Sequence, residues 1–324
     1  MQVSIGTFNL NNLFSRFNFS AQIAALPPHE AGGIELTFTE NEIKARTFMG
    51  RLVKGKDAAE TAKIANRILS MDVDILGVQE VEHIEILKEF NRTHLNGLYN
   101  HVVLIEGNDR RMIDVGLMSK LPIGAITSHQ AARHKDNPGK RAFGRDLLEV
   151  EILDDQGKKL LTIYNSHMKS HFVPHGQNPV EGARAANKRR QQQAEVTRDL
   201  ISARERKGAK FVLLGDMNDP PDSEFLTPML TIDDDPLSNG LANAQESQPL
   251  KPEHPANGPG PSTAIWTHRF DPGANQFPHY ELYDQIWLSK SLSGTLQSAH
   301  IDRRVHSVHG DGSDHDPAWV VLDI

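Results

Sequence analysis

Short runs of apolar residues recur along the chain, and most are too short for helices. Runs of this length, rich in Ile, Leu and Val, are typical of strands buried in a sheet. On this pattern we expect strands at residues 5–9, 74–80, 101–106, 115–118, 123–127, 146–153, 160–165, 211–214, near 265, 283–288, 298–302 and 317–322. The pattern therefore predicts a protein built mainly on sheets.

Other stretches carry apolar residues at helical spacing. Residues 57–71 place Ala58, Ala65 and Ile68 on one stripe, as a helix packed against a sheet requires. Helices are also expected at residues 81–95, 181–206 and, as a short piece, 222–230. A strand-rich half with helices, followed by a second such half, fits two stacked sheets covered by helices, an α/β fold.

Two segments carry no clear pattern. Residues 14–55 contain Pro-Pro and Gly-Gly pairs, which mark a loop insertion near the mouth of a site. Residues 237–262 are rich in Pro, Asn and Gly and predict an irregular loop. Apart from these two insertions, we expect one domain over residues 1–324.

Polar side chains stand at the ends of several predicted strands. Asn9, Glu80 and His167 each follow an apolar run, and Asp216 with Asn218 follows another. Strand ends are where α/β sheets usually place their chemistry. Further along, Ser313-Asp314-His315 precedes the last strand. A carboxylate beside an imidazole suits metal-assisted cleavage of a phosphate ester, whereas the simpler interpretation is a polar turn.

Composition narrows the possibilities. The chain of 324 residues has 35 basic and 42 acidic residues, a net charge of −7, and no cysteine. Thiol chemistry, disulfides and Cys-zinc sites are therefore excluded, and the acid excess argues against tight binding of duplex DNA. No apolar run reaches membrane-spanning length, so we expect no stable membrane association. The N-terminal strand follows no basic and apolar leader, so we expect a cytoplasmic protein, with secretion after trimming as the open alternative.

Taken in order, the strand-end motifs resemble the endonuclease/exonuclease/phosphatase superfamily over essentially the whole chain. The matching motifs are Phe8-Asn9, Gln79-Glu80, His167, Gly215-Asp216-Met217-Asn218, Asp284 and Ser313-Asp314-His315. The resemblance implies a four-layer α-β-β-α sandwich of two stacked mixed, mainly antiparallel sheets, as in deoxyribonuclease I. It also implies hydrolysis of phosphodiesters with Mg²⁺, for which Mn²⁺ can substitute, by in-line attack of an activated water.

The resemblance also implies roles for the strand-end residues. Glu80 is expected as the principal metal ligand, with Asn9 and Asp314 near the same ion. Asp216 would orient or deprotonate the attacking water. Asn218 would hold that water or a phosphoryl oxygen, although Asn218-Asp219-Pro220-Pro221 is also a strong turn signal.

The two histidines receive separate expectations. His315 matches the catalytic imidazole of the superfamily and Asp284 the carboxylate that orients it, which requires their strands to be neighbours. His167 is expected to protonate the leaving oxygen or bind the phosphoryl group, with Asp114 as its partner. The other histidines, among them His171, lack the spacing of a zinc motif, and we expect them at the surface or around the site.

Phosphate binding is expected from guanidinium and ammonium groups. Arg145 resembles a phosphate-contacting arginine of the superfamily, and guanidinium donates two parallel hydrogen bonds to phosphate. Arg111 and Lys169 are weaker candidates, because an exposed cation is more often simply solvated.

Substrate choice is left open among three functions. Departures from the motifs of abasic-site endonucleases and inositol polyphosphate phosphatases count against both groups and leave a broad group with His167, whose substrates range over DNA, RNA and small phosphodiesters. The complete set of acids, amides and imidazoles favours an endonuclease acting on DNA or RNA. Net acidity and the lack of an evident basic patch in the sequence favour the alternative, a phosphoesterase acting on a lipid headgroup or small phosphate ester. A binding protein that retained the fold is a third possibility, and no protein partner is implied.

Overall fold

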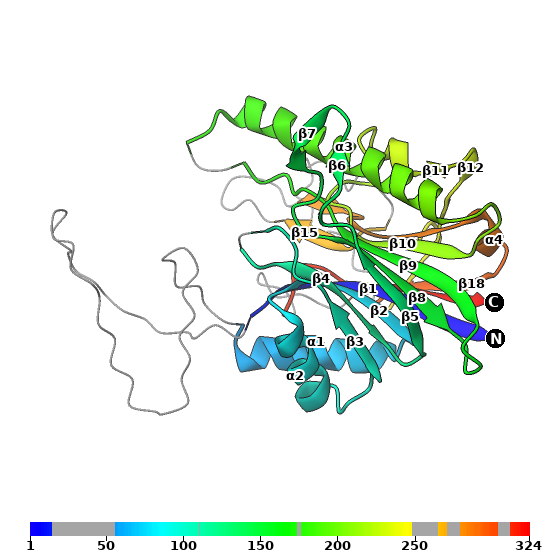
Figure 1. The fold of residues 1–324 in the computed structure, drawn as a ribbon. Helices are drawn as coiled ribbons and strands as arrows, with labels where there is room; N and C mark the ends of the chain where they lie inside the picture. Colours follow the sequence, from blue (N-terminus) through cyan, green and yellow to red (C-terminus); the bar gives the residue numbers. More distant parts are fainter. Residues whose placement is uncertain (15–55, 110, 174–175, 248–264, 271–278, 304–311) are drawn as a thin grey trace, which may run out of the picture.

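The computed structural model describes residues 1–14, 56–109, 111–173, 176–247, 265–270, 279–303 and 312–324 (Figure 1). Two stacked sheets form the centre, and helices cover both outer faces, which confirms the predicted four-layer sandwich. Within the described part of the chain, no helix is long and apolar enough to cross a membrane.

The first sheet contains seven strands in the order β14-β18-β19-β1-β2-β4-β3. Their bounds are β1 (Gln2–Leu13), β2 (Ile75–Val81), β3 (His101–Leu104), β4 (Asp114–Ser119), β14 (Gln245–Glu246), β18 (Leu296–Ile301) and β19 (Ala318–Asp323). The second sheet contains six strands in the order β13-β17-β10-β9-β8-β5. Their bounds are β5 (Ile123–Ser128), β8 (Leu147–Leu153), β9 (Lys159–His167), β10 (Phe211–Asp216), β13 (Ser238–Asn239) and β17 (Asp284–Leu288).

Helices and hairpins complete the described structure. The helices are α1 (Ala58–Met71), α2 (Ile84–His94), α3 (Pro179–Arg204), α4 (Lys290–Ser293) and the 3-10 turn η1 (Thr227–Met229). Three small hairpins pair β6 (Arg133–His134) with β7 (Asn137–Arg141), β11 (Thr231–Ile232) with β12 (Asp235–Pro236), and β15 (His268–Phe270) with β16 (His279–Glu281).

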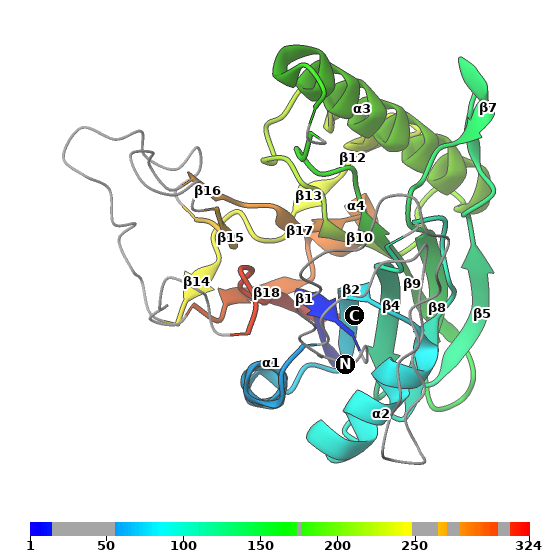
Figure 2. The same ribbon diagram turned by 90° about the vertical axis from the view of Figure 1, so that its left-hand side faces the viewer.

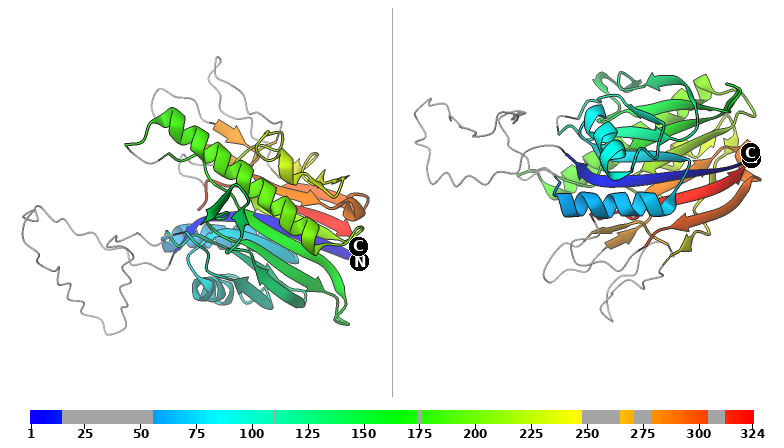
Figure 3. Two further views of the ribbon diagram at one scale, coloured as in Figure 1. Left: turned by 45° about the horizontal axis from the view of Figure 1, so that its top comes forward. Right: turned by 90° about the horizontal axis from the view of Figure 1, so that it is seen from below.

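Each sheet contains a parallel pair of strands with a helix between them in the sequence, and β14 and β18 form a further parallel pair in the first sheet. In the first sheet β1 and β2 are parallel and α1 lies between them in sequence, and in the second sheet β9 and β10 are parallel and connected through α3. Figure 3 shows α3 across one outer face and α1 across the other. Since parallel strands end at the same edge, the polar residues that follow them are brought together in pairs.

The helices form where capping and apolar spacing agree. Oδ1 of Asp57 accepts a hydrogen bond from the backbone N–H of Glu60 at 2.8 Å, which satisfies an otherwise unpaired amide at the start of α1. Ile64, Ala65 and Ile68 are buried on one side of this helix, so the predicted stripe is confirmed at Ala65 and Ile68, whereas Ala58 at the start of the helix is exposed.

The largely apolar core between the sheets contains the buried side-chain amide of Asn165. Nδ2 of Asn165 on β9 donates across the sandwich to the carbonyl oxygens of Val78 (3.1 Å) and Gly116 (2.7 Å), and its Oδ1 accepts from Nε2 of Gln79 at 2.8 Å. All three partners belong to the first sheet. A fully bonded buried amide fixes how the two sheets are aligned, because sliding would leave these groups unpaired.

Some sequence expectations differ from the structure. Residues 222–230 form only the turn η1 instead of a helix, because Pro220, Pro221 and Pro228 limit the available backbone donors. The strand expected near residue 265 lies instead at β15. The two predicted loops fall mostly on residues 15–55 and 248–264, which lie outside the described residues. Residues 237–247 contain β13 and β14.

Candidate active site

The site lies at the edge of the sandwich where β1 ends, which faces the viewer in Figure 2. It is built by the ends of β1, β2, β9 and β10, the start of β17 and the loop that carries Ser313-Asp314-His315. The register of the second sheet pairs His167 with Asp216 and Asp216 with Asp284, so the three form one row across β9, β10 and β17. Register partners point to the same face of a sheet. The row therefore presents an imidazole and two carboxylates side by side.

Asp216 lies where the two sheets meet. Its Oδ2 accepts a hydrogen bond from Nδ2 of Asn9 at 3.0 Å and lies 3.4 Å from Nε2 of His167 and 3.9 Å from Nε2 of His315. Burial raises the pKa of this carboxyl, the nearby Asp284 raises it further, and His315 opposes the shift. One carboxylate oxygen is thus within 4 Å of groups from both halves of the sandwich.

The backbone around Asp216 has little freedom. Gly215 has φ 129°, and a Cβ there would stand 1.9 Å from the carbonyl oxygen of Ser166. Only glycine fits this approach of β9 to β10. Oδ1 of Asp216 accepts from the backbone N–H of Asn218 at 2.9 Å, so the expected turn forms, and Nδ2 of Asn218 donates to the carbonyl oxygen of Met168 at 3.2 Å. Asn218 therefore takes part in the turn and also lies beside Asp216.

His315 and Asp284 form a buried pair. Nδ1 of His315 lies 2.6 Å from Oδ2 of Asp284, so the two strands are close enough for the contact that the sequence predicts. Burial alone would favour the neutral ring, but Asp284 and Asp216 raise the pKa of His315 well above its ordinary value. These two carboxylates therefore favour the protonated form of the imidazole.

The surroundings of His167 shift its pKa in the opposite direction to that of His315. It is buried, and burial together with the charge of Arg145 lowers the pKa of its ring well below the ordinary value. The expected partnership with Asp114 is wrong: Oδ1 of Asp114 accepts from the backbone N–H of Gly107 at 2.9 Å, and Nδ1 of His167 has no hydrogen-bond partner among the described residues. Burial raises the pKa of Asp114 to about 7, because the carboxyl stands away from solvent without a cationic partner.

Glu80, Asn9 and Asp314 are the expected metal ligands. Glu80 sits at an irregularity between β2 and β4 with φ 61°, which takes its side chain out of the regular ladder. Burial and the charge of Asp314 raise the pKa of Glu80. Ser313 Oγ donates to the carbonyl oxygen of Asn9 at 2.7 Å, so the final loop is fastened to the end of β1 beside Asp314. Two repelling carboxylates and an amide oxygen are a donor set that a hard divalent cation stabilises.

Lys56 is a further cation beside these acids. Its side chain is almost buried, and Nζ donates to the carbonyl oxygen of Gly312 at 2.5 Å. Burial lowers the pKa of Lys56, while the charges of Glu60, Asp314 and Glu80 oppose the shift. The ammonium therefore offsets part of the negative charge on the metal-ligand side, a role that the sequence did not reveal.

The expected phosphate ligands differ in their surroundings. Arg145 is buried, with Nη1 donating to the carbonyl oxygen of Met168 at 3.2 Å and Nε 3.4 Å from Oδ2 of Asp109. Arg111 is more than half exposed and is paired with the same Asp109 at 2.9 Å. Lys169 donates to two backbone carbonyls nearby, and burial followed by the charges of Arg145 and Arg111 lowers its pKa to about 8. Of the three, Arg145 is the one built into the site.

His268 is a site residue that the sequence did not indicate. It lies on β15, its ring centroid is 4.5 Å from that of His315, and its Nε2 is 3.8 Å from Oδ2 of Asp314. The ring of Tyr283 stacks on it at 4.9 Å. No sequence signal could have found it, since its strand has only three residues.

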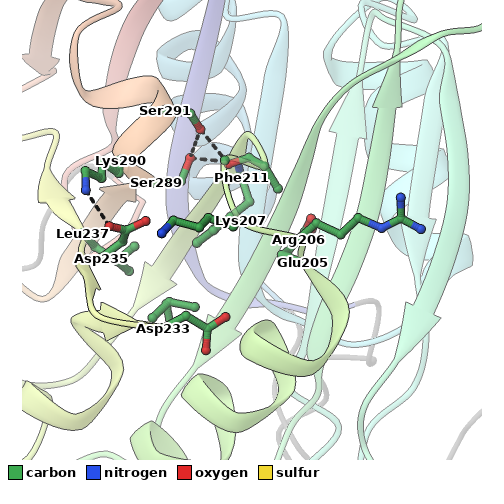
Figure 4. A pocket seen from close by; sticks show the side chains of 13 residues that line it. Glu205, Arg206, Lys207, Phe211, Asp233, Asp235, Leu237, Ser289, Lys290 and Ser291 are labelled. Atoms are coloured by element: carbon green, nitrogen blue, oxygen red, sulfur yellow. Dashed lines mark hydrogen bonds and ion pairs between the residues drawn. The ribbon is translucent and has the colours of Figure 1, made fainter.

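A pocket of about 290 Å³ lies at the opposite end of β10, beside Phe211 (Figure 4). Phe211 and Asp216 are five positions apart on the strand, about 16 Å of extended chain. The charged groups of the pocket include Lys290 and Asp235, which pair with each other at 2.6 Å. Its lining contains none of the site residues described above, so the pocket is separate from the candidate active site.

Comparison with known proteins agrees with this geometry. Residues 6–315 match the model of the Endonuclease/Exonuclease/phosphatase family. Solved structures share the fold at low sequence identity. A family protein from Bacteroides vulgatus has a TM-score of 0.59 and 15% identity, and the match covers 100% of this chain and 99% of that one. A mannosyl-6-phosphatase from Bacteroides thetaiotaomicron has a TM-score of 0.54 and 16% identity, with 99% and 100% covered, and truncated TDP2 from Caenorhabditis elegans has a TM-score of 0.54 and 14% identity, with 99% and 97% covered.

No curated protein matches the sequence significantly. Family members act on phosphoester bonds and typically use divalent metals. The family match spans both parallel strand pairs and the Ser313-Asp314-His315 loop. The chain therefore belongs to the endonuclease/exonuclease/phosphatase family.

Proposed function

We propose that the protein is a divalent-metal-dependent phosphodiesterase that cleaves nucleic acid endonucleolytically. The observation that carries this proposal is the position of Oδ2 of Asp216, within 4 Å of Asn9, His167 and His315. A base, a cationic imidazole and a neutral imidazole converging on one point suit attack of water on a phosphodiester.

The metal-binding side is assigned to Glu80, Asp314 and Asn9. A Mg²⁺ or Mn²⁺ ion held there would neutralise a phosphoryl oxygen and lower the barrier to attack. The raised pKa of Glu80 supports this assignment, because a cation would relieve the repulsion from Asp314 that contributes to the shift. Oδ1 of Asn9 already accepts from the backbone N–H of Asn11 at 2.9 Å, which orients the amide and leaves its second lone pair available.

The attacking side is assigned to the second sheet. Asp216 accepts the proton of the attacking water, and its raised pKa brings it closer to the pH at which a general base is effective. Cationic His315 stabilises the charge that develops on the phosphoryl oxygens. Neutral His167 donates a hydrogen bond to the leaving oxygen, and Arg145 and Asn218 hold the remaining oxygens.

A basic ridge next to the site supports a polyanionic substrate. We define the basic ridge as residues 133–141, which include the β6–β7 hairpin, and residues 184–190 of α3. These segments hold seven more cations than acids, although the whole chain carries −7. One of these cations, Arg190, is buried and paired with Asp219 at 3.0 Å. Overall charge does not reveal this local excess of cations. Arrayed Lys and Arg side chains are suited to a phosphate backbone.

A series of contacts connects the ridge to the site. Nε of Arg145 lies 3.4 Å from Asp109, the neighbouring Asn108 accepts a hydrogen bond from Arg141, and the backbone carbonyl of Arg141 accepts from Arg189. Nε2 of His134 lies 2.6 Å from Glu195, which fastens the hairpin to α3. Figure 2 shows β7 and α3 together along one border of the face onto which β1 ends.

A phosphatase of small esters is the second candidate. It is favoured by the overall acidity of the chain and by the fold shared with the mannosyl-6-phosphatase. Such an enzyme would need the same catalytic row but would not need the basic ridge.

The first experiment is incubation with supercoiled plasmid in Mg²⁺, with a chelator control, beside hydrolysis of bis(4-nitrophenyl) phosphate and of a sugar phosphate. We expect metal-dependent nicking that Glu80→Ala abolishes and Glu85→Ala, an exposed change on α2, preserves. Intact plasmid with hydrolysis of the sugar phosphate would favour the second candidate. Full activity of Glu80→Ala on every substrate would contradict the assigned metal site.

A further inference from the structure

We propose that Lys56 is a positioning residue of the metal-binding side, whose fixed positive charge weakens binding of the divalent ion and speeds the reaction that the ion assists. The inference rests on the proposed function, because it takes Glu80 and Asp314 as ligands of that ion. It arises from a buried ammonium that takes part in no step of the proposed mechanism.

The side chain of Lys56 lies in an unusual place for a lysine. It is 4% exposed, Nζ donates to the carbonyl oxygen of Gly312 at 2.5 Å, and Nζ lies 3.9 Å from Oε2 of Glu60. Lysines usually keep the ammonium in water, because its burial is costly unless opposite charges and hydrogen bonds compensate. The surroundings of Lys56 must therefore supply that compensation.

The hydrogen bond of Lys56 holds the loop that carries Asp314. Gly312 has φ 87°, and a Cβ there would stand 2.6 Å from the carbonyl oxygen of Glu60, so this loop lies directly against α1. The next residue, Ser313, is bonded at 2.7 Å to the end of β1. Lys56 and Ser313 thus fasten the two residues that precede Asp314, one to the start of α1 and the other to the first sheet.

Carboxylates from three elements compensate the charge of Lys56. Asp57 and Glu60 belong to the start of α1, Glu80 to the end of β2 and Asp314 to the final loop. Burial lowers the pKa of Lys56, and the charges of all four carboxylates oppose the shift. Two of the four are the assigned metal ligands. A divalent ion bound to them would be repelled by the ammonium that they already attract, so the ion binds less tightly than the carboxylates alone would allow.

The same charge favours the reaction itself. The ammonium is held by Gly312 and by burial, so it needs no rearrangement when negative charge develops on the phosphoryl oxygens. Fixed charges in a buried site stabilise a transition state more than mobile ones in water. Lys56 should therefore have opposite effects on affinity for the ion and on turnover, which a purely structural contact would not have.

The test is titration of the full chain with Mn²⁺, in which the electron paramagnetic resonance signal reports the free ion, beside kcat on bis(4-nitrophenyl) phosphate at saturating Mn²⁺. We expect Lys56→Met to bind Mn²⁺ about 10-fold more tightly, because a repelling charge is removed. Its kcat should fall about 10-fold, because the fixed cation is lost. Lys56→Arg keeps the charge and should return both values toward the wild type. Lys63→Met, an exposed change on α1, is the matched control and should alter neither.

Gly312→Ala separates the charge of Lys56 from its hold on the loop. The added Cβ displaces the loop while the ammonium remains, so this variant should bind Mn²⁺ more weakly than the wild type. Unchanged or weaker Mn²⁺ affinity in Lys56→Met, or affinity and kcat that fall together, would overturn the proposal and leave a structural contact. Lys56→Gln, a second neutral variant, should repeat the result if Lys56→Met folds poorly.

Glu80→Ala distinguishes failure of this inference from failure of the proposed function. Wild-type Mn²⁺ binding by Glu80→Ala would contradict the assigned metal site and with it the role of Lys56. Loss of Mn²⁺ by Glu80→Ala, with no tighter binding by Lys56→Met, would overturn the role of Lys56 alone.

Discussion

Nδ1 of His315 lies 2.6 Å from Oδ2 of Asp284, and both side chains are buried. His167, on the neighbouring side of Asp216, has its pKa lowered while that of His315 is raised. The surroundings of these two histidines therefore shift their pKa values in opposite directions and favour different protonation states. Separation of this kind is how enzymes keep an acid and a base in the same site.

Replacing Asp284 with Asn should remove the charge that keeps His315 protonated. We expect kcat/KM on bis(4-nitrophenyl) phosphate to fall by about 10²–10⁴. The remaining activity should shift toward acid pH, because the imidazole then needs more protons in solution to become a cation. The measurement is a pH profile of both enzymes, with Asp235→Asn on the distant pocket as control. A variant profile that superimposes on the wild type would contradict the charge argument.

Lys169 predicts a second feature of the pH profile. Its pKa is lowered to about 8, so its ammonium is present below that pH and lost above it. If the ammonium binds phosphate, kcat/KM should fall as pH rises through 8. Lys169→Arg keeps its charge and should maintain activity to higher pH, whereas Lys169→Met should be weak throughout. An alkaline limb that Lys169→Arg leaves in place would exclude Lys169 as the group responsible.

The basic ridge predicts a difference between large and small substrates. Lys140→Glu with Lys188→Glu, both exposed, should reduce plasmid cleavage at low salt and lower the slope of log affinity against log salt by about two, since each phosphate contact contributes about 0.9. Hydrolysis of bis(4-nitrophenyl) phosphate should stay unchanged. Lys63→Glu, exposed on α1, is the matched control. Equal losses on both substrates would point to a damaged site instead of a lost docking surface.

Arg67 joins α1 to the loop that carries His315. Its side chain is fully buried, with Nε 3.2 Å from Asp302 and Nη2 2.6 Å from Asp316. Arg67→Met should lower the free energy of unfolding by about 3 kcal/mol, the low end of the range for a broken buried pair, because Asp316 keeps its contact with Arg303 at 3.3 Å. Urea denaturation measures the change. Arg92→Met, which breaks an exposed pair with Glu89 on α2, should cost less than about 1 kcal/mol.

Much of the site could be predicted from the sequence because its residues end apolar strands. Asn9, Glu80, His167 and Asp216 each follow such a run, and the strand register then brings them together. The position of Asp284 was harder to predict, because its contact with His315 joins two segments that are 31 positions apart in the chain. Its assignment came from the resemblance and not from periodicity.

The remaining features depend on tertiary packing. His268 reaches the site on a strand too short to leave a periodic signal. The Asp114 pairing failed because the carboxylate accepts instead from the backbone of Gly107, a contact that no side-chain pattern encodes. The basic ridge went unseen because net charge averages over surfaces that the fold separates.

The amide of Asn165 has a consequence for anyone who would rebuild this chemistry elsewhere. Its hydrogen bonds cross from β9 to Val78 and Gly116 and so hold the half that carries Glu80 at a set distance from the half that carries Asp216. Grafting only the catalytic side chains onto another sandwich would reproduce their identities but not their spacing. A graft would have to include the buried amide of Asn165 as well as the row of His167, Asp216 and Asp284.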